Sequence, residues 1–175
     1  MAVLSRKPLV FFHGLEGSPT GYKGSFLQSR YPDLIAPYLS SDLEERLTVA
    51  LGAVVEPSVI VGSSLGAVTA LMFAQKRPDL VLGLVLLAPA VGYYDWTLVP
   101  TNKQQLIRQL SIPAKIPCQV IAAQQDEIIP PQAVVDFVAK APTVEWVDLQ
   151  FVEDNHGLGK SLVQMNQAIE ALMEN

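Results

Sequence analysis

The sequence predicts an α/β fold in which a mostly parallel sheet of about six strands is covered by helices on both faces, within one domain of residues 1–175. Short apolar segments of strand length alternate with helical patterns along the chain, as in repeated strand–helix–strand units. Several segments are apolar at every position, which is typical of strands buried on both faces of a parallel sheet. Loops rich in glycine or proline follow them and mark the strand ends.

The first expected strand covers residues 7–12, Lys-Pro-Leu-Val-Phe-Phe. The loop after it, residues 13–19, holds two glycines and a proline, so its backbone can turn N–H groups toward a neighbour. A helix is expected over residues 21–30, before Tyr31-Pro32. A second strand is expected over residues 33–37, and Pro37 indicates a strand end or a sheet edge.

The next helix is predicted from a capping box, with Ser41 at the N-cap and Glu44 three residues later. Its expected apolar face comprises Leu43, Leu47, Leu51 and Val54. A strand over residues 59–61 and a helix that continues to about Lys76 and stops before Pro78 come next.

The second half of the chain repeats the alternation. Strands are expected over residues 81–87, 118–123 and 144–152, and helices over residues 132–140 and 160–173. The segment 91–116 departs from this pattern, with a short amphipathic helix over residues 101–110 between irregular parts. It leaves the sheet at the edge where active groups of such folds gather, so we expect a small partial lid.

The strongest chemical signal is Gly62-Ser63-Ser64-Leu65-Gly66, directly between a strand and a helix. A Gly-x-Ser-x-Gly turn in this context presents one hydroxyl at the end of the sheet, here that of Ser64. The two glycines allow strand and helix to approach closely. Ser63 lies at the spacer position and has the wrong register, so Ser64 is the candidate nucleophile.

A serine nucleophile needs a base and an acid that orients the base. His156 follows the last expected strand, and Asp126 follows the strand before it, which gives the order Ser, acid, His. Glu127 and Asp154 remain alternative acids. Cleavage of an acyl bond also needs donors for the developing oxyanion, and the backbone N–H groups of Leu15 and Leu65 are the candidates.

Other residues near these loops have weaker signals. His13 is expected to fix the loop that carries Leu15 and not to act as a base. Tyr94 and Trp96, with Tyr93 beside them, could supply apolar surface to a substrate pocket, or pack into the core.

Together these motifs make the chain resemble a compact α/β-hydrolase. The resemblance rests on His13-Gly14 after an early strand, the elbow from Gly62 to Gly66, Asp126 with Pro130, and His156-Gly157. More narrowly, the chain is similar to short bacterial esterase-like members, which open with the His-Gly strand and a Ser-Pro loop, here Ser18-Pro19. Two strands that usually precede His-Gly are missing, and Ala67 and Ala123 replace glycines common in the family. The resemblance implies a trimmed sheet and catalysis without a cofactor or a metal.

Composition excludes several other classes. The formal net charge is −5 and no cluster of Lys or Arg occurs, which argues against a nucleic-acid surface. No run of about 18 apolar residues and no secretory signal are present, so we expect a cytoplasmic protein without stable membrane association. Cys118 is expected to be buried and inert.

The leading hypothesis is a serine hydrolase that cleaves a carboxylic ester or thioester of a small-molecule acyl substrate through an acyl-enzyme. A non-catalytic binding protein on the same scaffold is one rival. A lyase or perhydrolase that uses the same triad is another.

Overall fold

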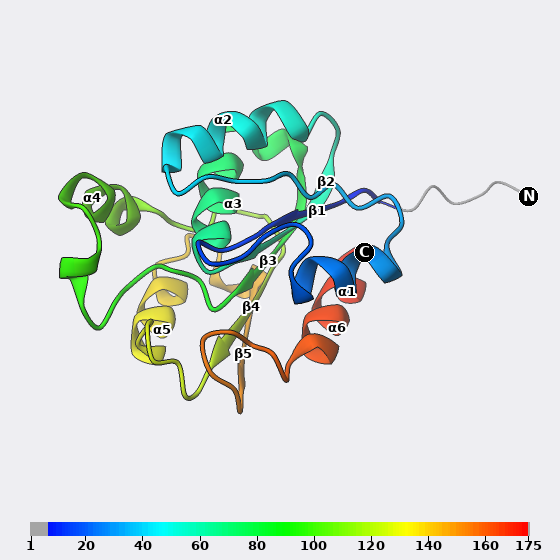
Figure 1. Ribbon diagram of the computed structural model, residues 1–175. Helices are drawn as coiled ribbons and strands as arrows, with labels where there is room; N and C mark the ends of the chain where they lie inside the picture. The colour runs from blue at the N-terminus through cyan, green and yellow to red at the C-terminus, as the bar shows by residue number, and fades with distance from the viewer. Residues whose placement is uncertain (1–6, 175) are drawn as a thin grey trace, which may run out of the picture.

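The computed structural model describes residues 7–174. Its centre is a parallel sheet of five strands, β1 (Leu9–Phe12), β2 (Ser58–Ser63), β3 (Val81–Leu87), β4 (Cys118–Ala123) and β5 (Val147–Val152), and the strands lie side by side in chain order. Figure 1 shows them as a twisted layer between two groups of helices. The predicted α/β class is therefore confirmed, with one strand fewer than expected.

The expected strand over residues 33–37 is reduced to a single parallel bridge between Ile35 and Val10. The Ile35 N–H donates to the Leu9 carbonyl at 2.9 Å, and the Phe11 N–H donates to the Ile35 carbonyl at 2.8 Å. Pro37 has no N–H to give, so pairing with β1 stops after this one residue.

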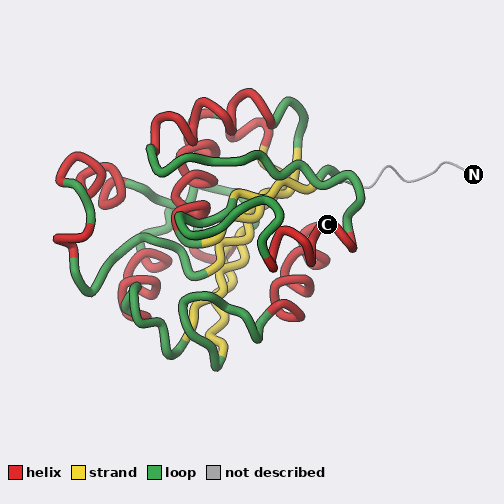
Figure 2. Tube along the Cα trace, viewed as in Figure 1, coloured by secondary structure: helices red, strands yellow, loops and turns green. Residues whose placement is uncertain are grey.

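The helices largely follow the sequence pattern (Figure 2). They are α1 (Tyr22–Arg30), α2 (Leu43–Ala53), α3 (Leu65–Lys76), α4 (Thr101–Gln109), α5 (Pro131–Ala139) and α6 (Leu162–Met173). Three short 3₁₀ turns join them to the strands: η1 (Pro78–Leu80), η2 (Trp96–Leu98) and η3 (Val144–Trp146). The turn η3 takes the first three residues of the strand expected over residues 144–152.

Helix α2 begins one residue later than the capping box predicts. Asp42, not Ser41, is its N-cap, and the Asp42 carboxylate accepts from the N–H groups of Glu44 and Glu45 at 3.0 Å each. Leu51, expected on the buried face, is 39% exposed. Leu51 lies eight residues after Leu43, which places it about 80° around the helix from Leu43, at the edge of the buried face. The buried positions of the helix are those of Leu43, Arg46 and Ala50.

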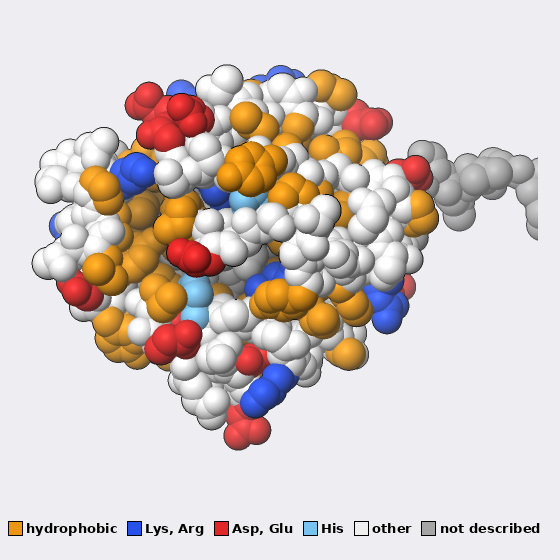
Figure 3. Space-filling view, in the orientation of Figure 1, with side chains coloured by type: hydrophobic (Ala, Val, Ile, Leu, Met, Phe, Trp, Pro, Cys, Tyr) orange, Lys and Arg blue, Asp and Glu red, His pale blue; other side chains and the backbone are white. Residues whose placement is uncertain are grey.

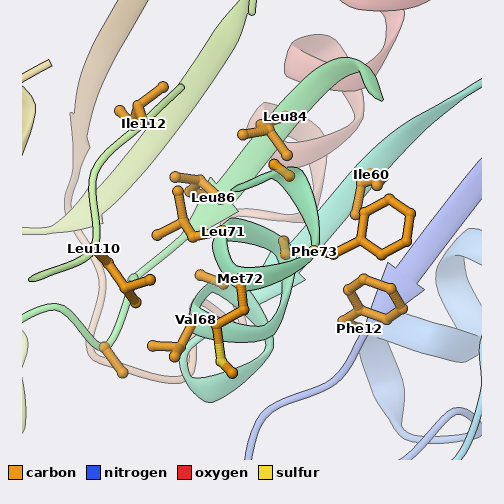
Figure 4. Close-up of a cluster of buried hydrophobic side chains, with 14 of the residues drawn as sticks. Phe12, Ile60, Val68, Leu71, Met72, Phe73, Leu84, Leu86, Leu110 and Ile112 are labelled. Carbon is orange, nitrogen blue, oxygen red and sulfur yellow. The ribbon is translucent and has the colours of Figure 1, made fainter. Parts of the chain in front are cut away.

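The sheet is covered on both faces because alternate strand residues point to opposite sides. One face packs on α2, α3 and α5 through residues such as Phe12, Ile60 and Leu84 (Figure 4). The other face packs on α1 and α6 through Phe11, Val59 and neighbours of the same parity. Cys118 is buried in the first of these layers, as predicted, and burial raises the pKa of its thiol, which keeps the thiol protonated.

The order of the strands places a crevice between the carboxyl ends of β1 and β2. From β1 the chain crosses to Ile35 at the outer side of β1, then returns through α2 to form β2 on the other side. The loops after β1 and β2 therefore run in opposite directions, and such a reversal opens a crevice at the carboxyl ends of the strands. Within residues 7–174, none of the helices has the length and apolar character needed to cross a bilayer.

Candidate active site

Ser64 lies at the apex of the turn between β2 and α3. Its φ and ψ are 55° and −113°, a conformation that side chains with a Cβ rarely adopt. The turn is held on both sides, because the Ser64 N–H donates to the Leu87 carbonyl at 2.8 Å and the Ser64 carbonyl accepts from Ala67 at 3.0 Å. Such strain costs on the order of 1–3 kcal/mol and persists only where the surroundings fix it.

Both glycines of the motif are required by contacts across the turn. A Cβ on Gly62 would lie 2.6 Å from the Ala67 Cα. A Cβ on Gly66 would overlap the Phe12 carbonyl and lie 2.9 Å from the His13 carbonyl oxygen. Because these neighbours are backbone atoms, they cannot rotate away. Helix α3 thus passes directly against the end of β1.

The structure brings Ser64, His156 and Asp126 together from three separate loops. The Ser64 Oγ lies 2.8 Å from His156 Nε2, and His156 Nδ1 lies 2.8 Å from Asp126 Oδ2. The other carboxylate oxygen of Asp126 accepts from the N–H groups of Ile128 and Ile129, at 2.9 and 2.8 Å. An ionised carboxylate can only accept, so Nδ1 carries the proton and Nε2 is left to accept from the Ser64 hydroxyl.

Both alternative acids accept hydrogen bonds from the histidine loop; Glu127 lies in the loop after β4, and Asp154 lies within the histidine loop itself. Glu127 accepts from the backbone N–H of His156 at 3.0 Å. Asp154 accepts from Ser161 and from the backbone of Asn155 and Lys160. Burial alone would raise the pKa of Asp154, but these hydrogen bonds outweigh it and hold the pKa below its ordinary value. Both carboxylates shape the loop, and Asp126 is the one that touches the imidazole.

The loop after β1 lies against the nucleophile. Gly14 and Gly17 close a turn through a 3.2 Å hydrogen bond, with Leu15 and Glu16 at its corner. A Cβ on Gly14 would lie 3.4 Å from the Ser64 Cβ, so the turn packs directly on the elbow. Leu65 begins α3, and the first N–H groups of a helix have no partner within it. Both Leu15 and Leu65 line the same cavity as Ser64.

His13 fixes this turn from behind. Its Nδ1 donates to the Gly14 carbonyl at 2.7 Å, and its Nε2 accepts from the Leu39 N–H at 2.9 Å. Burial lowers the pKa of His13, an effect that the nearby Arg46 guanidinium reinforces and the bond to Gly14 opposes. His13 is therefore a neutral group that joins two chain segments, and it does not contact the Ser64 hydroxyl.

Arg46 is a part of the site that the sequence reasoning missed. It is fully buried in α2, and its guanidinium donates to the Thr69 hydroxyl at 3.0 Å, to the Ser40 carbonyl at 3.1 Å and to the His13 carbonyl. Burial lowers its pKa to about 10, so it is charged at neutral pH. The available signal was its position, three residues after Leu43, on the apolar face of α2.

Ser64 and His156 line a cavity of about 440 Å³. The segment 91–116 forms part of its wall through Tyr93, Leu98, Val99, Pro100, Lys103 and Ile107. Neither Tyr94 nor Trp96 lines the cavity. Tyr94 is 62% exposed, and Trp96 packs against Tyr93, with ring centroids 5.2 Å apart, and beneath the Arg108 guanidinium. Figure 3 shows histidine surface within a hollow on this face, bordered by hydrophobic surface.

The chemistry available in the cavity comes from side chains and backbone N–H groups. Among residues 7–174, no three His, Cys, Asp or Glu side chains are grouped in a way that could hold a metal ion. The arrangement can move a proton from a serine hydroxyl to an imidazole beside two candidate oxyanion donors.

The fold and these residues define an α/β hydrolase with a serine at its elbow. A family model described as "Serine hydrolase" matches residues 9–156, from β1 to His156, and the chain belongs to that family. The coarse activity, a hydrolase, follows from this membership. A search of curated proteins finds no match to the chain.

Solved structures support the fold. A protein from Xanthomonas campestris assigned to the α/β superfamily of hydrolases is 23% identical with a TM-score of 0.73, covering 97% of this chain and 99% of that one. The α/β hydrolase domain-containing protein 10 from mouse is 18% identical with a TM-score of 0.75, covering 95% and 89%. An esterase from a marine microorganism is 15% identical with a TM-score of 0.70, covering 95% of each chain.

Proposed function

We propose that the protein hydrolyses a carboxylic ester or thioester of a small-molecule acyl substrate, with Ser64 as nucleophile, His156 as general base and acid, and Asp126 as the residue that orients His156. The observation that carries this proposal is the unbroken chain of hydrogen bonds from Ser64 Oγ through the imidazole to Asp126, at 2.8 Å for each step. Ser64, the first residue of this chain of hydrogen bonds, lines an accessible cavity.

In the first half-reaction, Ser64 Oγ attacks the acyl carbon while His156 Nε2 takes the hydroxyl proton. The resulting oxyanion accepts from the N–H groups of Leu15 and Leu65. When the tetrahedral intermediate collapses, the bond to the alcohol or thiol breaks and the imidazolium returns the proton to that leaving group. Asp126 stabilises the imidazolium and keeps the proton on Nδ1.

In the second half-reaction a water molecule replaces the alcohol or thiol. His156 Nε2 removes a proton from this water as its oxygen attacks the acyl-enzyme, and then protonates Ser64 Oγ as the carboxylic acid leaves. The segment 91–116 acts as a partial lid in this scheme. Its apolar wall residues, Leu98, Val99 and Ile107, supply surface for an acyl chain.

Labelling with a fluorophosphonate tests the mechanism, since this probe reacts with an activated serine. We expect one label, on Ser64, and its loss in Ser64→Ala and in His156→Ala. A non-catalytic binding protein on the same fold would remain unlabelled, which would contradict the proposal.

Substrate class is tested with a panel of p-nitrophenyl esters and acyl-CoAs of graded chain length. The expected result is hydrolysis of at least one series, abolished by Ser64→Ala in a protein that still folds. Labelling without hydrolysis of either series would favour a lyase or perhydrolase and contradict the ester or thioester assignment.

A further inference from the structure

Lys23 is a basic side chain that lines the same cavity as the triad but has no part in the scheme above. It lies in the first turn of α1, and its Nζ donates to the Gly157 carbonyl at 2.5 Å and to the Tyr22 hydroxyl at 2.6 Å. Gly157 directly follows His156, so the ammonium group lies close to the histidine of the triad.

Among residues 7–174, no carboxylate lies within ion-pair distance of the Lys23 ammonium group. The charged pair closer than 4 Å in this part of the chain is Arg77 with Asp79, and the contact of His156 with Asp126 is the hydrogen bond described above. The Lys23 side chain is half-buried, and this burial lowers its pKa to about 8, against the opposing attraction of Asp154. The group remains largely charged at neutral pH, and a desolvated charge is stabilised by a counter-ion.

The ammonium group can accommodate such a counter-ion. It has three N–H donors, and two of them are directed at the Gly157 carbonyl and the Tyr22 hydroxyl. The start of α1 adds to the positive potential, because the first turn contains no acidic residue and its N-cap, Gly21, has no side chain that could satisfy the first N–H groups.

The part of the cavity away from Lys23 is mostly apolar. Leu43, Val99 and Ile107 give the lid side an apolar wall. Lys103 also lines the cavity, on the lid side, where its Nζ donates to the Ser41 carbonyl at 2.9 Å, so it is the second cation that the test must separate from Lys23. Glu16, on the turn after β1, is the acidic side chain of the lining and works against anion binding. The cavity therefore joins an apolar part and a cationic part, with Ser64 also in its lining.

We propose that Lys23 forms a carboxylate-binding subsite beside the triad, so that the preferred substrates are esters with an anionic group a few atoms from the scissile carbonyl. Monoesters of short dicarboxylic acids have this chemistry. The proposal rests on the proposed ester hydrolysis and adds the substrate class.

The test compares two esters of equal chain length, p-nitrophenyl hydrogen glutarate and p-nitrophenyl pentanoate. Lys23→Met should lower the ratio of kcat/KM for glutarate over pentanoate about tenfold, since a charge-assisted hydrogen bond is lost only with the anionic ester. Lys23→Arg should keep most of the ratio. Lys76→Met, which removes an equal charge at the exposed end of α3, is the matched control and should leave it unchanged.

Two results would overturn the assignment. If Lys23→Met lowers kcat/KM equally for both esters, Lys23 only holds the histidine loop. If Lys103→Met reduces the ratio more than Lys23→Met does, the carboxylate binds on the lid side.

Glutarate binding, measured by calorimetry, separates this proposal from the proposed function, because it requires no turnover. Wild-type protein should bind glutarate about tenfold more tightly than Lys23→Met. Tighter binding without hydrolysis of either ester would sink the proposed reaction and keep the subsite. Equal binding by the two proteins would reject the subsite.

Discussion

Replacing Ser64 by glycine should give a more stable protein than replacing it by alanine. Both variants lose the hydroxyl and its hydrogen bond to His156, so this loss cancels in the comparison. They differ in the Cβ, which alanine retains at φ 55° and ψ −113°. Glycine adopts positive φ without steric cost, whereas a residue with a Cβ does not.

The size of the difference follows from two opposing terms. Relief of the backbone strain is worth about 1–3 kcal/mol. Glycine has greater conformational freedom in the unfolded chain, and this lowers the stability of Ser64→Gly by about 0.4–1 kcal/mol. With the midpoints of both ranges, the net advantage of Ser64→Gly over Ser64→Ala is about 1.3 kcal/mol, or roughly 3–5 °C in Tm for a chain of this size.

Urea unfolding and thermal melting of the two variants measure this difference, and assays with p-nitrophenyl esters should find both inactive. The same pair of substitutions at Ser29, an exposed position within α1, is the matched control. There glycine should be the less stable variant by about 1 kcal/mol, because helix propensity favours alanine. Equal stability of the two Ser64 variants, or a more stable alanine variant, would show that the elbow is not strained.

Three further predictions concern the acid, the cavity wall and the pH dependence of stability. Asp126→Asn should lower kcat about 10⁴-fold because it permits the wrong imidazole tautomer, while Glu127→Gln should cost less than tenfold; the reverse order would move the acid to Glu127. Ile107→Ala should shift kcat/KM toward longer acyl chains and Tyr94→Ala should not, and a shift in Tyr94→Ala alone would contradict the observed wall. The native state keeps His13 neutral while the unfolded chain takes up a proton below pH about 6.5, so stability should fall as the pH drops from there toward the lowered pKa of His13. Urea titrations between pH 7 and 5 should give a shallower fall for His13→Gln than for wild type, and equal slopes would refute this linkage.

The sequence was sufficient for most strands and for the elbow because their signals are local. An apolar strand, a Gly-x-Ser-x-Gly turn and an apolar helix follow one another without a gap between residues 58 and 76. Asp126 and His156 could be chosen because each lies in a loop just after a strand, and parallel strands end at one edge of the sheet.

The wrong predictions arose where the same local sequence pattern fitted two alternatives. Both Ser41 with Glu44 and Asp42 with Glu45 fit a helix-capping pattern. Leu43 packs in the core as the first residue of the helix that Asp42 caps, so the second start is the one observed. In the segment after β3 the chain has no regular period, so sequence could not tell which of the neighbouring aromatic side chains faces the cavity.

Arg46 links the formation of the site to the packing of α2, a helix that carries none of the three residues Ser64, Asp126 and His156. Its three hydrogen bonds join α2 to Thr69 in α3, to the segment at Ser40 and to the end of β1 at His13. During refolding, the elbow can form as soon as β2 and α3 meet, but the hydrogen bond from Arg46 to the His13 carbonyl, which supports the end of β1, forms only when α2 docks. The return of catalytic activity would then report the arrival of α2, and it would lag behind the recovery of helical circular dichroism.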